Sequence, residues 1–156
     1  MNRVLAISLG AAVLVGAAVL ACGWGSSDPA GTVLKPSDQQ VLAIGQAIYA
    51  DNCASCHGAE LEGQPNWRSP GLDGRLPAPP HDETGHTWHH DGDTLFRLTK
   101  YGTGALIGDP DYASNMPIYE SILTDDEIIA VLSYIKSTWP QKIRERHDVM
   151  ERNRSR

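Results

Sequence analysis

The feature that most constrains this 156-residue chain is the short run Asn52-Cys53-Ala54-Ser55-Cys56-His57. It has the spacing C-x-x-C-H, in which two residues separate the cysteines and a histidine follows the second one directly. Within one helical turn, this spacing places both sulfur atoms and the imidazole on the same side of the backbone. The chain must therefore fold so that two thiols and one imidazole face a common ligand.

Three kinds of site use such a set of side chains. C-x-x-C-H is the attachment sequence of haem c, in which each thiol adds across one haem vinyl group and the histidine faces the iron. A thioredoxin-like redox pair needs a neighbouring βαβ pattern, and none is visible. A zinc site would combine Cys53 and Cys56 with His86 and His90, but the 29 residues between the two halves far exceed the usual finger spacing. The sequence therefore favours covalent haem.

The N-terminal residues have the composition of an export signal. A short positive start is followed by 18 residues without a charge, Val4 to Ala21, and then by Cys22. The ending Val-Leu-Ala-Cys is similar to the lipobox of bacterial lipoproteins, in which the cysteine is acylated after cleavage. An uncleaved membrane anchor and a secreted protein with an incidental Cys22 are the alternatives. In each case we expect residues 1–21 to direct the protein out of the cytoplasm, to the periplasmic or cell-surface side, and residues 22–36 to act as a flexible tether.

Hydrophobic periodicity predicts a few helices and no strands. We expect a helix at about 38–51 with Ser37 as its N-cap, and a short one through 94–99. A third begins at Thr124, which forms a capping box with the glutamate three residues later, and stops near Trp139.

Long loops rich in glycine and proline connect these helices at 58–90 and 102–121. Loops of that length usually serve a site. The expected organisation is one all-α domain at 37–140, followed by a charged C-terminal tail at 141–156.

From residue 45 to residue 139 the chain resembles a class I c-type cytochrome. The matching features are G-Q-A-I-Y-A-D-N-C-A-S-C-H-G at 45–58, P-G-L-D-G at 70–74, N-M-P at 115–117 and the helix at 125–139. The resemblance implies a cytochrome c-like fold, in which a few helices and long loops wrap around one covalently bound haem. It also implies contact between the first and last helices, at positions matching Gly45, Tyr49 and Tyr134.

The resemblance assigns roles to individual residues of this chain. Cys53 and Cys56 match the thioether cysteines, and His57 matches the proximal ligand of the haem iron. Pro70 matches a proline whose carbonyl accepts a hydrogen bond from Nδ1 of that histidine, and Leu72 matches an apolar residue packed on the haem. Such outer partners orient a ligating histidine and raise its basicity.

Met116 matches the distal ligand of the iron. Apart from Met1 the chain has one other methionine, Met150, which lies in the charged tail. A core methionine that fills a gap is the alternative interpretation of Met116. Ligation by histidine and methionine raises the reduction potential and closes both axial positions. Outer-sphere electron transfer is therefore the expected activity, and the protein is expected to be a carrier rather than an enzyme.

A histidine-rich segment departs from the family pattern. Residues 79–90 hold four of the six histidines, which are His81, His86, His89 and His90. A copper site is one interpretation, since imidazole suits copper. Packing at the haem edge together with Trp67 and Trp88 is the second, and replacement of Met116 as the iron ligand is the third.

Charge constrains the partners. Residues 22–139 contain 16 acidic and 6 basic side chains, which excludes a nucleic-acid footprint and predicts redox partners with a basic docking patch. Residues 141–156 contain 6 basic and 3 acidic side chains, and we expect either a frayed end or a contact with anionic lipid or an acidic partner.

The sequence as a whole predicts a membrane-tethered, monohaem cytochrome c that transfers single electrons outside the cytoplasm. Two alternatives stay open. One is a haem subunit or copper-handling accessory of a larger oxidase or dehydrogenase complex, and the other is a haem-based gas sensor.

Overall fold

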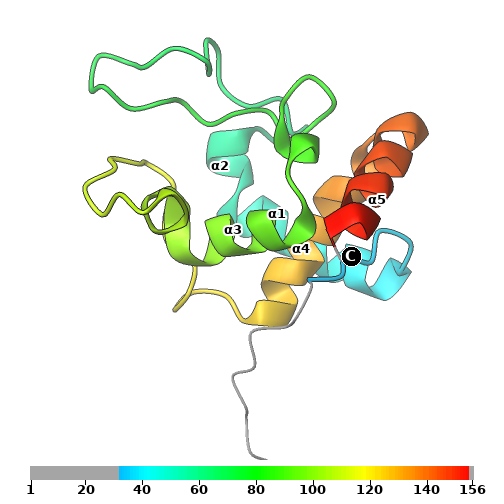
Figure 1. Cartoon of the computed structure of the whole chain (residues 1–156). Helices are drawn as coiled ribbons and strands as arrows, with labels where there is room; N and C mark the ends of the chain where they lie inside the picture. Colours follow the sequence, from blue (N-terminus) through cyan, green and yellow to red (C-terminus); the bar gives the residue numbers. More distant parts are fainter. Residues whose placement is uncertain (1–31, 155–156) are drawn as a thin grey trace, which may run out of the picture.

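The computed structural model describes residues 32–154. The targeting segment expected at 1–21, Cys22 and most of the tether expected at 22–36 lie outside these residues. Figure 1 shows the order of the helices and the long loops between them. The elements are α1 (Gln39–Asn52), α2 (Ala54–His57), the 3₁₀ turn η1 (Thr87–His89), α3 (Gly92–Ile107), α4 (Asp125–Thr138) and α5 (Gln141–Arg154). Residues 32–154 contain no strand, so the all-α expectation is confirmed. None of the helices in this range is long and apolar enough to cross a membrane.

The centre of the fold is the contact between α1 and α4. A Cβ atom added at Gly45 would lie 2.1 Å from the carbonyl oxygen of Ala130 and 2.9 Å from Cβ of Tyr134, so the two helices touch almost backbone to backbone. Next to this point the rings of Tyr49 and Tyr134 lie with their centroids 5.6 Å apart. The contact that the resemblance implied between these helices is therefore present.

Apolar side chains of α1, α3 and α4 make up the core around this contact. Its fully or nearly fully buried members include Ile48, Leu95, Phe96, Ile128, Val131, Ile135 and Trp139. In α4 the buried residues Ile128, Val131 and Ile135 recur at helical spacing, so this helix turns one apolar face to the core.

The predicted ends of the helices need two corrections. Asp38, and not Ser37, caps α1, because its carboxylate accepts hydrogen bonds from the backbone N–H groups of the second and third helical residues at 3.1 and 3.2 Å. The short helix expected through 94–99 is the first part of α3, which continues past a kink at Gly102 to Ile107. Gly102 adopts φ 82°, a left-handed conformation that glycine tolerates, and the helix bends there. The capping box of Thr124 is confirmed.

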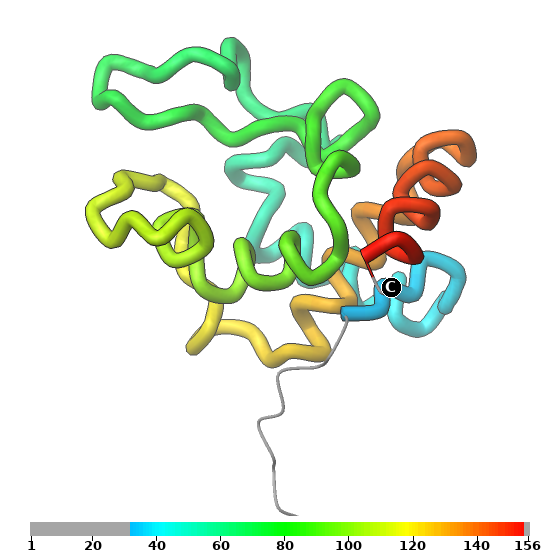
Figure 2. Tube along the Cα trace, in the orientation of Figure 1, coloured from blue at the N-terminus to red at the C-terminus, as the bar shows by residue number. Residues whose placement is uncertain are grey.

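Residues 141–154 form α5 instead of a frayed tail. The ring of His147 is completely buried, and its Nε2 donates a hydrogen bond to the carbonyl of His90 at 2.9 Å. Glu151 accepts a hydrogen bond from the backbone N–H of Gly92, and Arg154 pairs with Asp91 and Asp93. Figure 2 shows the C-terminal trace returning beside the start of α3. The charges that made this segment look like a tail therefore hold it against the domain.

We predict that Gly45→Ala lowers the free energy of unfolding of the holoprotein by about 1–3 kcal/mol. The added methyl group overpacks the helix contact, and this outweighs a gain in helix propensity of about 1 kcal/mol. Ala47 is exposed on the same helix and provides a control: Ala47→Gly is expected to cost only about 1 kcal/mol. Denaturant unfolding measures both, and a neutral or stabilising Gly45→Ala contradicts the close contact.

A second prediction concerns pH. Burial, with a smaller effect from nearby Lys136, holds the pKa of His147 below its usual value, and its Nδ1 is buried without a hydrogen-bond partner. Because the unfolded chain binds this proton more readily, the stability that neutral His147 provides is present above about pH 6.5 and is lost as the pH falls through the folded-state pKa.

His147→Phe is therefore expected to be about 1 kcal/mol less stable than the wild type near pH 7.5, because it loses one hydrogen bond. This deficit should shrink towards about pH 5, where only the wild type is destabilised by protonation of this residue. Denaturant unfolding at several pH values tests this, with the exposed His89→Gln as control. A deficit that stays constant or grows as the pH falls would show that His147 does not titrate in this way.

Candidate haem site

The C-x-x-C-H run forms a single helical turn. Cys53 ends α1 and caps α2, and its carbonyl accepts hydrogen bonds from the backbone N–H groups of Cys56 at 3.1 Å and His57 at 2.9 Å. Cys53 and Cys56 are not joined in a disulfide. Cys53 is partly buried, and this burial is the main reason why its pKa is raised to about 11. Cys56 is exposed. The turn therefore presents two thiols and an imidazole within five residues, as their spacing predicts.

His57 is the most buried member of this turn, at 7% exposed. Its Nδ1 lies 2.9 Å from the carbonyl oxygen of Pro79. A carbonyl only accepts, so Nδ1 carries the hydrogen and Nε2 keeps its lone pair. Burial holds the pKa of His57 below its usual value, which favours this neutral form. A neutral imidazole with a lone pair on Nε2 is the form that ligates a metal.

The partner of His57 is a correction to the sequence interpretation, which gave this role to Pro70. Residues 61–64 run beside residues 78–81, with hydrogen bonds from Gln64 N to Ala78 O and from His81 N to Leu61 O, both at 2.8 Å. A Cβ atom at Gly63 would lie 2.4 Å from the backbone nitrogen of Pro80, so the two segments are in close contact.

This pairing brings Pro79 beside the haem-attachment turn. Residues 65–77, which connect the two paired segments, form a loop that we call the excursion. Pro70 is exposed on this excursion. Leu72 lies in a turn closed by hydrogen bonds from Gly71 N to Arg75 O and from Gly74 N to Gly71 O, and its side chain is fully exposed. The packing of Leu72 on a haem stays a prediction.

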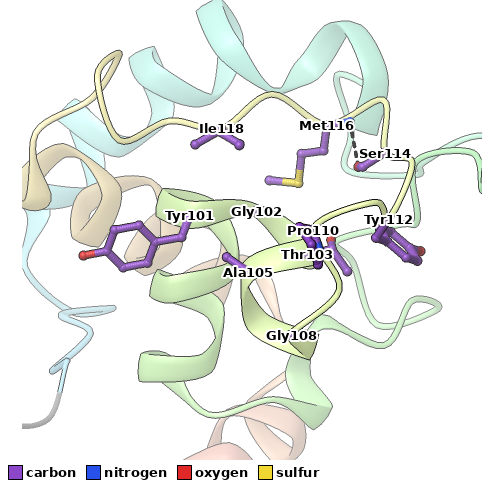
Figure 3. A pocket seen from close by; sticks show the side chains of 11 residues that line it. Tyr101, Gly102, Thr103, Ala105, Gly108, Pro110, Tyr112, Ser114, Met116 and Ile118 are labelled. Atoms are coloured by element: carbon purple, nitrogen blue, oxygen red, sulfur yellow. Dashed lines mark hydrogen bonds between the residues drawn. The ribbon is translucent and has the colours of Figure 1, made fainter.

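Met116 lies at a cavity of about 550 Å³ beside the C-terminal part of α3. Figure 3 shows its thioether extending between the turn at Gly102 to Ala105 and the segment of Ile118. The other lining residues are Tyr101, Thr103, Gly104, Gly108, Pro110, Tyr112 and Ser114. Met116 is partly buried and does not belong to the core cluster found within residues 32–154. Met116 therefore does not serve as a core side chain in this structure, and its ligation of a haem iron stays a prediction.

Two contacts hold the loop that carries Met116. Tyr119, 5% exposed, donates a hydrogen bond from its hydroxyl to the carbonyl of Asn52 at 2.7 Å. On the other side, Nη1 of Arg75 donates to Oδ1 of Asn115 at 2.8 Å. The first contact ties the methionine loop to the residue that precedes Cys53, and the second ties it to the excursion. Sequence reasoning missed Tyr119 and Pro79, because both act through partners distant in the chain.

The histidine-rich segment packs against other rings. His81 stacks on His57, with centroids 3.9 Å apart and planes at 18°, and His86 stacks on Trp67 at 5.0 Å. The ring of His89 lies 3.8 Å from that of Trp88. Burial foremost, and the neighbouring His57 next, hold the pKa of His81 well below its usual value. Across residues 32–154 no three His, Cys, Asp or Glu side chains are grouped so that they could hold a metal ion, so the copper interpretation has no donor cluster to rest on.

Comparison with known proteins decides the family. The cytochrome c family model matches residues 42–139, which is more than half of the chain. The chain belongs to the cytochrome c family. The match begins within α1 and ends just after α4, so the C-terminal helix α5 lies beyond the matched region.

Curated relatives add a narrower likeness. The cytochrome is 31% identical over 105 residues to the Cbb3-type cytochrome c oxidase subunit CcoP of Rhodobacter capsulatus. It is 31% identical over 112 residues to the protein of that name from Rubrivivax gelatinosus. These alignments cover 66% and 71% of this chain but only 31% and 30% of the relatives, so the chain spans about a third of their length. No solved structure matches the chain significantly.

The residues present fit the covalently bound haem c that the family implies. The attachment turn supplies two thiols, and the buried His57 is held neutral with Nδ1 already bonded, which leaves Nε2 for iron. The sulfur of Met116, a soft donor, lies at a cavity, and the loop that carries Met116 is hydrogen-bonded to Asn52, next to that turn. Thiol, imidazole and thioether together make the donor set of a haem c site.

Proposed function

We propose that this cytochrome carries one haem c and transfers single electrons between redox partners outside the cytoplasm. The observation that supports this most strongly is the one-turn helix α2, which presents two thiols and a buried, neutral imidazole in a chain of the cytochrome c family. Cys53 and Cys56 are the proposed thioether positions. His57 and Met116 are the proposed axial ligands.

Each of these residues has a distinct task. When bound, the haem supplies a one-electron Fe(III)/Fe(II) couple. The carbonyl of Pro79 orients His57 and raises its basicity through the Nδ1 hydrogen bond. Met116 would contribute a weakly donating thioether that favours Fe(II), which would make the potential high relative to ligation by two nitrogen atoms. If His57 and Met116 both hold the iron, no position is left for a substrate and the chain needs no acid or base of its own, so we propose a carrier rather than an enzyme.

Charge and location complete the proposal. Residues 22–139 hold 16 acidic and 6 basic side chains, and some of the basic residues in α4 and α5 are occupied by ion pairs such as Lys136–Asp148 and Arg154–Asp91. An acidic surface steers the protein toward a basic docking patch on its partner. We propose that residues 1–21 export the protein, that acylated Cys22 tethers it to the membrane, and that the haem domain runs from residue 37 through α5.

A role as a haem subunit of an oxidase complex is the second candidate. The likeness to CcoP subunits of cbb3-type oxidases favours it. The electron-transfer role of the haem is the same in both cases. Native gel electrophoresis of membranes solubilised in mild detergent separates them, since a subunit migrates with oxidase activity and a free carrier does not.

The thioether assignment predicts that haem stays with the polypeptide after denaturation. Haem staining of a denaturing gel should give a band at the position of the chain in the wild type. The double variant Cys53→Ala/Cys56→Ala is expected to lose this band, because no thiol remains to bond the haem. Cys22→Ser is the matched control and should keep it. If the haem of the wild type is extracted into acid acetone, the thioether assignment is wrong.

The distal assignment predicts the behaviour of Met116 variants. Met116→Ala should open the sixth position, let the reduced protein bind carbon monoxide and remove the weak far-red sulfur-to-iron band of the oxidised form. Met116→His should keep the position closed and lower the potential, because a stronger nitrogen donor favours Fe(III). Met150→Ala in α5 is the control and should match the wild type. If an alanine variant of His81, His86, His89 or His90 changes the spectrum and Met116→Ala does not, Met116 is not the ligand.

A further inference from the structure

A histidine without a role in the proposed function lies face to face with the proposed proximal ligand. The rings of His81 and His57 are 3.9 Å apart between centroids and only 18° from parallel. We propose that His81 is a positioning residue that fixes the plane of the His57 ring, and this inference rests on the proposed ligation of iron by His57.

The ring of His57 needs a second constraint because its hydrogen bond alone does not fix the plane of the ring. The hydrogen bond from Nδ1 of His57 to the carbonyl of Pro79 fixes where one edge of the ring points. A single hydrogen bond tolerates a broad range of directions at the acceptor, so the ring can still rock about it. A flat ring packed against one face of His57 removes much of this freedom. Pro79 and His81 therefore constrain different motions of the same side chain.

His81 can constrain its neighbour because it is itself held at three points. Its backbone N–H donates to the carbonyl of Leu61, and its own carbonyl accepts from Nε1 of Trp139, both at 2.8 Å. Nδ1 of its ring lies 2.8 Å from Oγ1 of Thr87. The Thr87 hydroxyl in turn donates to the carbonyl of Pro80 at 3.4 Å, so it accepts from the His81 ring. Trp139 and Thr87 are 1% and 5% exposed, and these anchors are therefore part of the packed interior.

The anchors connect this stack to the C-terminal part of the chain. Trp139 ends α4, and its ring lies 5.2 Å from that of the buried His147 in α5. His147 also donates to the carbonyl of His90, at the far end of the histidine-rich segment. Both ends of that segment are thus fastened to the core, which gives the His81 ring a firm support.

The plane of an axial imidazole decides which iron d orbital its π system overlaps, and so sets the magnetic anisotropy of low-spin Fe(III). A rotation of the His57 ring therefore changes the electron paramagnetic resonance g values and the spread of the haem methyl proton shifts. A side chain that only fills space would leave these signatures unchanged. They separate a positioning role from a merely structural one.

The experiment compares oxidised holoprotein carrying His81→Ala, His81→Phe or Thr87→Val with the wild type. His81→Ala removes the stacked face and should shift the largest g value by more than its linewidth and alter the spread of the haem methyl shifts. His81→Phe keeps a flat ring and should restore most of the wild-type pattern. Thr87→Val keeps its volume but frees the His81 ring, and should give a smaller change in the same direction. His89→Ala, an exposed histidine of the same segment, is the control and should change nothing.

Each outcome has a definite meaning. A His81→Ala protein that binds haem and keeps the wild-type g values and methyl shifts overturns the inference. If His81→Ala does not fold, Thr87→Val decides, and a wild-type signature in that variant overturns the inference equally. A wild-type protein without the low-spin ferric signal of a histidine-ligated haem c would instead contradict the proposed function itself, whatever the variants show.

Discussion

The backbone of α1 touches that of α4 at Gly45, where no side chain other than hydrogen fits against the carbonyl of Ala130. This contact fixes the direction in which α1 runs, and α1 ends directly at Cys53, where the attachment turn begins. Because α4 supplies the largest share of the core, α1 and the attachment turn that follows it are held against a well-packed part of the molecule. The position of the cofactor site therefore depends on a helix contact about two turns before Cys53.

The loops are held less by packing than by a few long-range hydrogen bonds. Tyr119 joins the methionine loop to the carbonyl of Asn52, and Trp139 joins the core to the carbonyl of His81. Arg75 and Asn115 link the two long loops to each other at the protein surface. The first two bonds involve buried rings and contribute to rigidity, whereas the exposed one contributes less, since exposed polar pairs are weak. The buried hydrogen bond of Tyr119 therefore holds the loop that carries Met116 in place, although that loop is long and irregular.

Local sequence predicts the elements whose cause is local. The spacing C-x-x-C-H implies one helical turn, and Thr124 with the glutamate three residues on implies a helix start. The contact at Gly45 was expected from the resemblance to c-type cytochromes. The partner of His57 was not predictable in this way. Prolines at positions 70 and 79 both lie in the same long loop, and only the pairing of residues 61–64 with residues 78–81 brings Pro79 to the ring.

Helix α5 shows the same limit. Its composition is that of a solvated tail, because its stabilising partners, the carbonyl of His90 and the backbone of Gly92, lie about 60 residues earlier in the chain. Periodicity within the segment carries little information about such partners. His147 is the buried residue of α5, and its role appears only once its distant acceptor, the carbonyl of His90, is known.

The central claim is that this chain holds one haem, whose iron has a protein ligand on each side, and that this haem exchanges single electrons. A potentiometric titration followed by optical spectroscopy, with haem and protein quantified in the same sample, tests it most directly. The account predicts one haem per chain, a single reversible one-electron transition and a reduced spectrum that does not change under carbon monoxide. Two transitions, a different stoichiometry or rapid carbon monoxide binding by the wild-type protein would contradict it.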